Sequence, residues 1–136
     1  MRDDNCIFCR ILNGDIPSRK VFEDDDFCVI MDVDPATKGH CLILPKEHYA
    51  NLLAMPDELA ARVLPLAKKV AAHLQETLGC DGINLVQNNG ETAGQTVFHF
   101  HMHLIPRYKE DGQKIGWNPG SPSQEELEEI KNQILS

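Results

Sequence analysis

The sequence has no excess of positive charge. Its 13 lysine and arginine residues are outnumbered by 21 aspartate and glutamate residues, which gives a formal net charge of −8 at pH 7. Proteins that bind nucleic acid through its phosphates carry an excess of basic residues. The composition therefore excludes a polycationic nucleic-acid binder, and any anionic ligand must be bound by donors that the fold gathers locally.

Long apolar runs and internal repeats are also missing from the 136 residues. No stretch approaches the ~20 apolar residues that span a bilayer, and residues 1–5 are too polar for the apolar centre of a signal peptide. We therefore expect a cytoplasmic protein with no membrane partner. Because no low-complexity linker divides the chain, the sequence predicts one domain over residues 1–110 and a tail over residues 111–136.

Hydrophobic periodicity predicts an α+β fold. The expected short elements are a helix at residues 7–12 and strands at residues 20–23, 27–31, 41–44, 83–87 and 97–105. Apolar residues three or four positions apart predict one long helix over residues 57–78, which Gly79 ends and which Pro65 either kinks or divides into two abutting helices. Ser123 and Glu126 have a capping-box spacing, which predicts a short acidic helix in the tail. Strands before and after one long helix indicate a mainly antiparallel sheet of about five strands.

Residues 97–105 alternate apolar side chains with His99, His101 and His103. A period of two is typical of a strand and places the three imidazoles on one face. At a rise of about 3.3 Å per residue, the outer two histidines lie roughly 13 Å apart, so one ion cannot comfortably bind all three. A neutral imidazole has a free lone pair at pH 7, which makes His101 a candidate nucleophile for phosphoryl or nucleotidyl chemistry. His103, if protonated, could donate to phosphate oxygens. The alternative is a half-exposed strand whose histidines have no role.

The loop at residues 88–96, which precedes the histidines, is small and polar. Its exposed N–H groups could form an anion-binding concavity, and Gln95 and Thr96 add side-chain donors. A phosphate would fit there. An ordinary hairpin connection is the alternative interpretation of this loop.

Five cysteines, an odd number, do not indicate a disulfide framework. Cys6 and Cys9 form a Cys-x-x-Cys pair that is typical of metal sites, and a tetrahedral zinc needs two further ligands, for which His48 and His99 are candidates. From the residues alone, two other interpretations stay open: free buried thiols and a redox pair. The remaining cysteines are expected to be packing residues.

The motif Gly94-Gln95-Thr96-Val97, followed by His99-Phe100-His101-Met102-His103, resembles the signature of the histidine triad (HIT) nucleotide hydrolases and transferases. More specifically, it is similar to their Hint-like phosphoramidase branch. The likeness extends in the family's order through Cys6-Ile7-Phe8, Ile16-Pro17, Asp32-Val33-Asp34-Pro35, Gly39-His40 and Pro45-Lys46-Glu47-His48. The tail is less covered by it.

This resemblance implies a HIT-like fold, a homodimer and a nucleoside monophosphate site at the histidines. By the likeness, His101 attacks the α-phosphorus to form a nucleotidyl-histidine that water resolves, while His103 and His40 contact or protonate phosphate and leaving-group atoms. Asp32 would hold the ribose hydroxyls, which suit a carboxylate, although an aspartate that only starts a turn is the alternative. Thr96 would contribute to the rate. The other nucleotide contacts that the resemblance implies are phosphate partners Asn88, Gln95 and Thr96 and base-pocket residues Ile7, Phe8, Ile11, Ile30 and Val33.

Family members with a Cys-x-x-Cys at this position pair it with a later histidine and with the first histidine of the triad. Cys6, Cys9, His48 and His99 match that pattern. The resemblance therefore implies a structural zinc, which would fasten the N-terminal segment to the histidine segment.

The expected function is hydrolysis of purine nucleoside 5′-phosphoramidates or related AMP derivatives, without a catalytic metal. Within the family, the alternative is a diadenosine polyphosphate hydrolase. Two alternatives belong to other classes: a metal-dependent hydrolase that uses His101 and His103 as ligands, and a nucleotide-binding or scaffold module without turnover.

Overall fold

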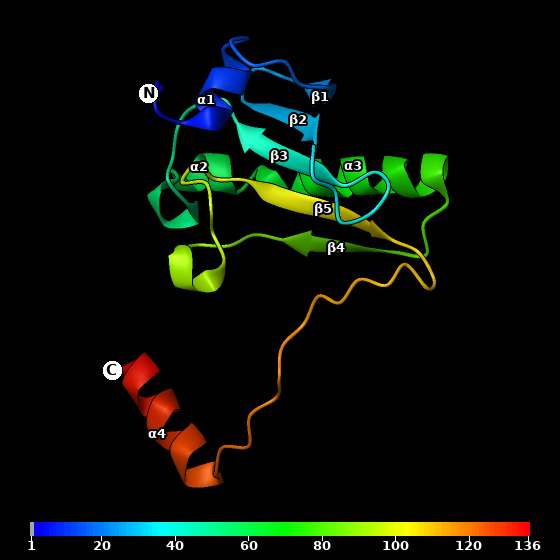
Figure 1. Cartoon of the computed structure of the whole chain (residues 1–136). Coiled ribbons are helices and arrows are strands. Elements are labelled where there is room, and N and C mark those ends of the chain that lie inside the picture. The colour runs from blue at the N-terminus through cyan, green and yellow to red at the C-terminus, as the bar shows by residue number, and fades with distance from the viewer. Residues whose placement is uncertain (1) are drawn as a thin grey trace.

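A computed structural model describes residues 2–136 of the chain. Its centre is an antiparallel sheet in the order β1-β2-β3-β5-β4 (Figure 1). The strands are β1 (Lys20–Glu23), β2 (Phe27–Met31), β3 (Cys41–Pro45), β4 (Gly82–Val86) and β5 (Met102–Arg107). The predicted α+β fold with a five-stranded antiparallel sheet is confirmed.

Two apolar clusters cover the two faces of this sheet. On one face, helix α3 (Val63–Leu78) packs its buried residues against Val29, Ile43 and Leu104. On the other face, helix α1 (Ile7–Leu12) packs against Ile30 and Leu44. Successive strand residues point to opposite faces, so the same two strands, β2 and β3, supply both clusters. Helix α1 is thereby held over the face that α3 leaves free.

The long helix predicted over residues 57–78 is divided in two. Helix α2 (Asp57–Ala60) ends before α3 begins at Val63, which confirms the two-helix alternative, with the break upstream of Pro65. The proline lies in the first turn of α3, where its missing N–H leaves no intrahelical hydrogen bond unmade. As predicted, Gly79 ends α3 in the left-handed conformation, at φ 65°, and its N–H donates to the Gln75 carbonyl.

The last strand is shorter than predicted. Because β5 begins at Met102, only His103 of the three histidines lies in a strand, and the prediction of one strand over residues 97–105 is wrong for its first half. The neighbouring strand β3 ends at Pro45, which has no N–H to extend the ladder. The preceding segment instead pairs with a loop, since the Phe100 N–H donates to the Tyr49 carbonyl over 2.7 Å. The alternation survives this change, because Phe100 and Leu104 are both buried in the cluster that contains α3.

The tail ends in helix α4 (Gln124–Leu135), which begins with the predicted capping box of Ser123 and Glu126. An extended segment carries α4 away from the sheet (Figure 1). Its apolar residues are exposed: Leu127 by 49%, Ile130 by 53% and Ile134 by 76%. The division of the chain near residue 110 stays a prediction. Among residues 2–136, no helix has the length and apolar character needed to cross a membrane.

Candidate functional site

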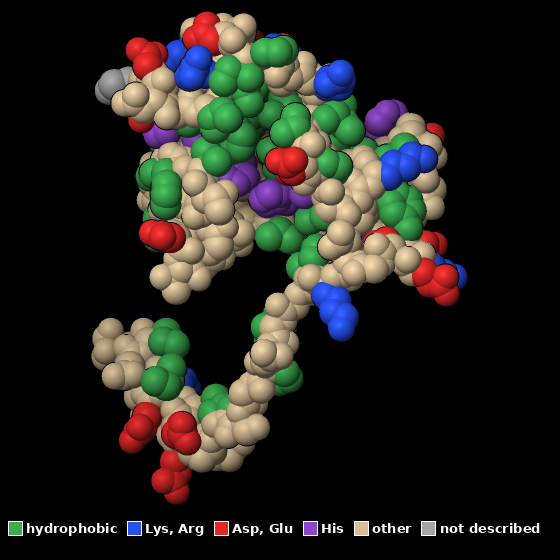
Figure 2. Space-filling model, viewed as in Figure 1, with side chains coloured by type: hydrophobic (Ala, Val, Ile, Leu, Met, Phe, Trp, Pro, Cys, Tyr) green, Lys and Arg blue, Asp and Glu red, His purple; other side chains and the backbone are tan. Residues whose placement is uncertain are grey.

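Histidine side chains from distant segments gather in a hollow on the sheet face that carries α1 (Figure 2). They form two groups. One contains His48 and His99 with two cysteines, and the other contains His40 and His103 with Asp32. His101 lies between the groups in sequence, and its ring contacts that of His103 with centroids 5.1 Å apart.

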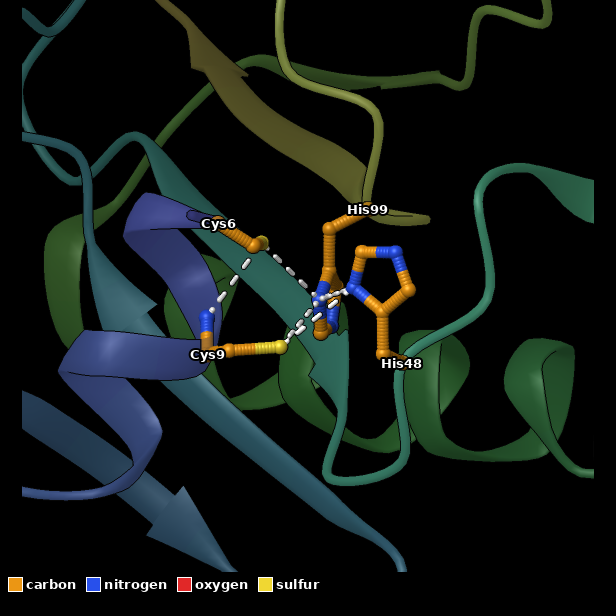
Figure 3. A group of neighbouring side chains, drawn as sticks. All are labelled: Cys6, Cys9, His48 and His99. Carbon is orange, nitrogen blue, oxygen red and sulfur yellow. Dashed lines mark hydrogen bonds between the residues drawn. The ribbon is translucent and has the colours of Figure 1, made fainter. Parts of the chain in front are cut away.

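The first group brings together the four predicted metal ligands, Cys6, Cys9, His48 and His99 (Figure 3). Cys6 is the N-cap residue of α1, and its sulfur accepts a hydrogen bond from the Cys9 N–H over 3.4 Å, so one helical turn aims both sulfurs to the same side. His48 comes from the loop after β3, and His99 comes from the segment before β5. All four ligand atoms lie within 4.8 Å of one another.

The spacing of these atoms fits a tetrahedral zinc. With bonds of ~2.3 Å to sulfur and ~2.0–2.1 Å to nitrogen, an ideal tetrahedron separates a sulfur from a nitrogen by about 3.5 Å and two nitrogens by about 3.4 Å. Here His99 Nδ1 lies 3.5 Å from each of the two cysteine sulfurs. His48 Nδ1 lies 3.3 Å from Cys9 Sγ and 3.2 Å from His99 Nδ1.

The orientation of His99 also suits a metal ligand. Its Nε2 lies 2.9 Å from the Pro45 carbonyl oxygen, which can only accept, so the ring proton is on Nε2. The lone pair of Nδ1 therefore points at the two sulfurs, as in metal sites where the second ring nitrogen of a histidine donates to a carbonyl. The four residues fit a closed zinc site.

His101 is oriented by the backbone of that first group. Its Nδ1 lies 2.8 Å from the carbonyl oxygen of His99, so Nδ1 carries the ring proton and donates it. The lone pair is then on Nε2, the nitrogen that a nucleophile would use. Phe8 packs edge-on against the ring, with centroids 5.0 Å apart. The fold thus holds His101 with its unprotonated nitrogen away from the His99 carbonyl.

A chain of hydrogen bonds, called the His40 relay below, determines which ring nitrogen of His40 and of His103 carries the proton. The Ala36 N–H donates to His40 Nδ1 over 2.9 Å, so His40 carries its ring proton on Nε2. That nitrogen lies 2.9 Å from His103 Nδ1 and donates to it. His103 therefore carries its own proton on Nε2 and presents an N–H donor. The carboxylate of Asp32, 3.4 Å from His40 Nε2, stabilises the same proton.

Both rings of this relay are neutral at pH 7. Burial, together with the neighbouring His101 and His40 rings, lowers the pKa of His103 to about 4. Burial also lowers the pKa of His40, against the opposing effect of Asp32. His103 accordingly donates as a neutral imidazole, not as the cation considered from the sequence.

The lowered pKa of His103 predicts a loss of stability in acid. In the unfolded chain the ring takes up a proton near pH 6.5, whereas in the fold it does so only near pH 4. Between these values the unfolded state binds more protons, so the free energy of unfolding should decrease as the pH falls through this window. Denaturant unfolding at pH 7 and pH 5, with an NMR titration of the His103 ring, measures both quantities. Titration of that ring at pH 6.5 or above would contradict the assignment.

A cavity of about 350 Å³ opens beside His101 and His103. Asp32 lies on its wall, as does Thr96, which is exposed there. The predicted base-pocket residues all line it: Ile7, Phe8, Ile11, Ile30 and Val33. Sequence reasoning missed several further lining residues, among them Ser18, Met31, Leu42 and Val97. Ser18 directly follows Ile16-Pro17, which is part of the family resemblance, and this position could have indicated that Ser18 lies near the site.

Gln95 and Asn88, both predicted phosphate partners, do not line this cavity. Gln95 is buried, and its side-chain oxygen accepts from the Gly90 N–H while its amide donates to the Ala50 and Val97 carbonyls. Both amide protons are thereby used within the protein. Gln95 holds the loop before the histidines in place, which leaves it no free donor for a phosphate in this arrangement.

A larger cavity of about 640 Å³ lies between β1 and α3. It is lined mainly by apolar residues such as Phe22, Val70 and Leu74, and it includes none of the predicted catalytic residues. Size alone does not mark the candidate site here, because His101, His103 and Asp32 all line the smaller cavity.

Known proteins share this fold and much of this sequence. The family model described as the HIT domain matches residues 13–110. The chain is 41% identical to adenosine 5'-monophosphoramidase hnt1 of Schizosaccharomyces pombe, with 97% of each chain covered. The crystal structure of a HIT family member from Bacillus subtilis has a TM-score of 0.90 and 42% identity, and the match covers 97% of this chain and 96% of that one.

A third protein bears on the group of Cys6, Cys9, His48 and His99. The solved structure of a Zn-bound histidine triad family protein from Mycobacterium smegmatis has a TM-score of 0.77 and 38% identity, over 85% of this chain and 84% of that chain. The family model covers well over half of the chain. The three relatives are 41%, 42% and 38% identical to it in sequence over most of its length. The chain belongs to the HIT, or histidine triad, family.

Proposed function

We propose that the protein hydrolyses purine nucleoside 5′-phosphoramidates, or related AMP derivatives, through a nucleotidyl group carried on His101. The observation that supports this most is the pair of ring orientations at the cavity. The His99 carbonyl leaves the lone pair of His101 on Nε2, and the His40 relay leaves a proton on Nε2 of His103. A nucleophile and a hydrogen-bond donor thus lie side by side, with ring centroids 5.1 Å apart.

The reaction would proceed in two displacements at phosphorus. In the first, His101 Nε2 forms a bond to the α-phosphorus while the bond from phosphorus to the amine nitrogen breaks, and the departing amine takes up a proton from solvent. The His103 N–H stabilises charge on the phosphate or on the leaving group. In the second, water attacks the phosphorus, the bond to His101 breaks, and the proton of the water is released. The products are the nucleoside monophosphate and the free amine.

Asp32 is placed to bind the ribose of such a substrate. One carboxylate oxygen accepts the Asp34 N–H over 2.8 Å, which is the turn contact considered as the alternative for this residue. The other oxygen faces His40 at 3.4 Å on the cavity wall. A carboxylate has capacity for two further donors there. We therefore assign the ribose hydroxyls to Asp32 and the base to the apolar wall that includes Phe8 and Ile30.

The relative from S. pombe, named as an adenosine 5'-monophosphoramidase, favours an amine leaving group. Hydrolysis of diadenosine polyphosphates would use the same steps with a phosphate leaving group, and no contact in the cavity separates the two. A metal-dependent reaction at His101 and His103 has less support. His101 is not in the group of potential metal ligands that contains His103, Asp32 and His40. Within that group, Nε2 of His40 and Nδ1 of His103 lie 2.9 Å apart and form a hydrogen bond with each other.

We also propose that Cys6, Cys9, His48 and His99 bind zinc in a structural role. With four protein ligands the site has no open position for substrate. When bound, the metal would supply no chemistry to the reaction. It would fix His99, whose carbonyl orients His101, and would hold α1 with Phe8 over the cavity.

A homodimer is the assembly that we propose. Strand β4 is at one edge of the sheet, with Leu85 45% exposed, and an uncovered edge is a ready surface for pairing with another copy. Helix α4, whose apolar residues are exposed, lies beyond the same edge (Figure 1). A 12-residue helix is marginal in water without a partner surface. Sedimentation of a species of twice 15.3 kDa would support this assembly.

Mass spectrometry of a quenched reaction tests the proposed function. The protein is mixed with adenosine 5′-phosphoramidate, stopped within one turnover, digested and analysed for a mass increase equal to one adenylyl group. We expect the adduct on His101 and release of AMP and ammonia in the unquenched reaction. An adduct on another residue, or AMP release without any adduct at early times, would argue for a different mechanism.

A further inference from the structure

The start of the tail is fastened to the loop that carries His40. The Gln113 side-chain amide donates to the Ala36 carbonyl over 2.9 Å. The Tyr108 hydroxyl donates to the Lys38 carbonyl over 2.8 Å, and the Thr37 hydroxyl donates to the Pro106 carbonyl. Three contacts therefore join residues 106–113 to residues 36–38, which only Gly39 separates from His40.

Arg107 holds Gln113 in position for this contact. Its guanidinium donates to the Gln113 carbonyl over 2.7 Å and to both carboxylate oxygens of Asp111 over 2.8 and 2.9 Å. A fourth hydrogen bond, of 2.9 Å, joins it to Asn84 on β4. A bidentate pair of this kind is geometrically specific, and it keeps the pKa of Asp111 well below its usual range. The backbone of Gln113 is thus anchored to the sheet, although the residue is exposed.

Ala36 connects this anchor to the His40 relay. Its carbonyl accepts from Gln113, and its own N–H donates to His40 Nδ1. That N–H and the Asp32 carboxylate together keep the ring proton of His40 on Nε2. If Ala36 moved away, His40 could carry its proton on Nδ1 and offer a bare Nε2 to His103. His103 would then have to place its proton on Nδ1, and it would face the cavity with a lone pair where it now presents a donor.

We propose that Gln113 is a positioning residue, which acts through Ala36 and His40 to keep the donor proton of His103 on Nε2. Its effect on rate rests on the proposed function, because it matters only if His103 donates to the substrate. Gln113 touches neither the cavity nor any predicted catalytic residue. Its contribution is to the direction of a hydrogen bond and not to the binding of the nucleotide.

Gln113→Glu tests this proposal with little change of shape, because a carboxylate cannot donate to the Ala36 carbonyl. Gln113→Ala provides a second variant without the added charge, and Lys114→Ala, at the exposed neighbouring position, is the matched control. For both Gln113 variants we expect kcat for adenosine 5′-phosphoramidate to fall about fivefold, the effect of losing one neutral hydrogen bond, with KM unchanged. The control should keep the wild-type kcat.

Ring-nitrogen NMR of the full chain gives a readout that a purely structural role would not change. In the wild type, the His40 and His103 signals should show protonated Nε2 and bare Nδ1. In both Gln113 variants they should show a mixture of the two forms. Wild-type signals in the variants would overturn the proposal, and so would changed signals with an unchanged kcat. If the wild type has no turnover, the hydrolase proposal fails while the NMR comparison still decides whether Gln113 positions the rings.

Discussion

His101→Ala should remove turnover of adenosine 5′-phosphoramidate and leave binding of AMP nearly unchanged. The substitution deletes the nitrogen that would attack phosphorus, and loss of a covalent nucleophile lowers the rate by about 10³-fold or more. The cavity keeps its apolar wall and the Asp32 carboxylate, which are the groups assigned to nucleotide binding. Steady-state kinetics measures the first effect, and isothermal titration with AMP measures the second.

The matched control for this variant is His73→Ala. His73 is an exposed histidine on α3, and it lines the larger cavity, away from the reactive one. Its removal should leave kcat and KM at their wild-type values. A His101→Ala protein that still turns over at the wild-type rate would refute the nucleophile assignment. A nucleotide-binding module without turnover would instead show no rate in the wild type and equal AMP binding in all three proteins.

Cys9→Ser should lower both the zinc content and the thermal stability. Serine replaces a thiolate ligand with a hydroxyl that does not ionise at neutral pH, so the set of four donors is incomplete. Structural zinc contributes much of the folding free energy of small zinc peptides, and a larger core reduces that share. If the lost ligand costs about 3 kcal/mol, the Tm should fall on the order of 10 °C. Elemental analysis of the purified protein and thermal unfolding provide the two measurements.

Cys80→Ala is the control for loss of a buried cysteine outside the metal cluster. It should retain one zinc per chain, whereas zinc-free wild-type protein would contradict the structural zinc site. Treatment with a chelator separates the mechanisms as well. At a temperature where the metal-free protein stays folded, the proposed reaction should continue, while a reaction that uses a catalytic metal would stop at once.

Local patterns explain why so much of the fold could be predicted. The capping box at Ser123 and the glycine that ends α3 are signals within a few residues of the feature that they determine. The error in the last strand has a different origin. Alternation correctly indicated which side chains face α3, but whether a segment joins a ladder depends on its neighbour. The ladder between β3 and β5 goes no further than Ile43 opposite Met102, and the Phe100 N–H donates to the Tyr49 carbonyl instead.

The candidate site divides in the same way. The Cys-x-x-Cys spacing and the alternating histidines pointed to both groups, because spacing within one helical turn or one strand is a local property. His48 and His99 could be named as candidate partners of the two cysteines, whereas the roles of His40 and Asp32 beside His103 came only from the family resemblance. Gln95 shows the limit: a polar side chain beside the histidines looked like a phosphate donor, and its three internal hydrogen bonds could not be seen in the sequence.

By itself, the sequence indicated the class of chemistry. It places three imidazoles in register and two thiols at a spacing suited to zinc, and it lacks the excess of positive charge that a polyanion would require. Only the tertiary structure decided which nitrogen of each ring carries its proton. That choice is made by contacts such as His40 with His103, 63 positions apart, and Gln113 with Ala36, 77 positions apart. Residues so distant in the chain come into contact only when the strands assemble into the sheet. No local sequence pattern therefore predicts their pairing.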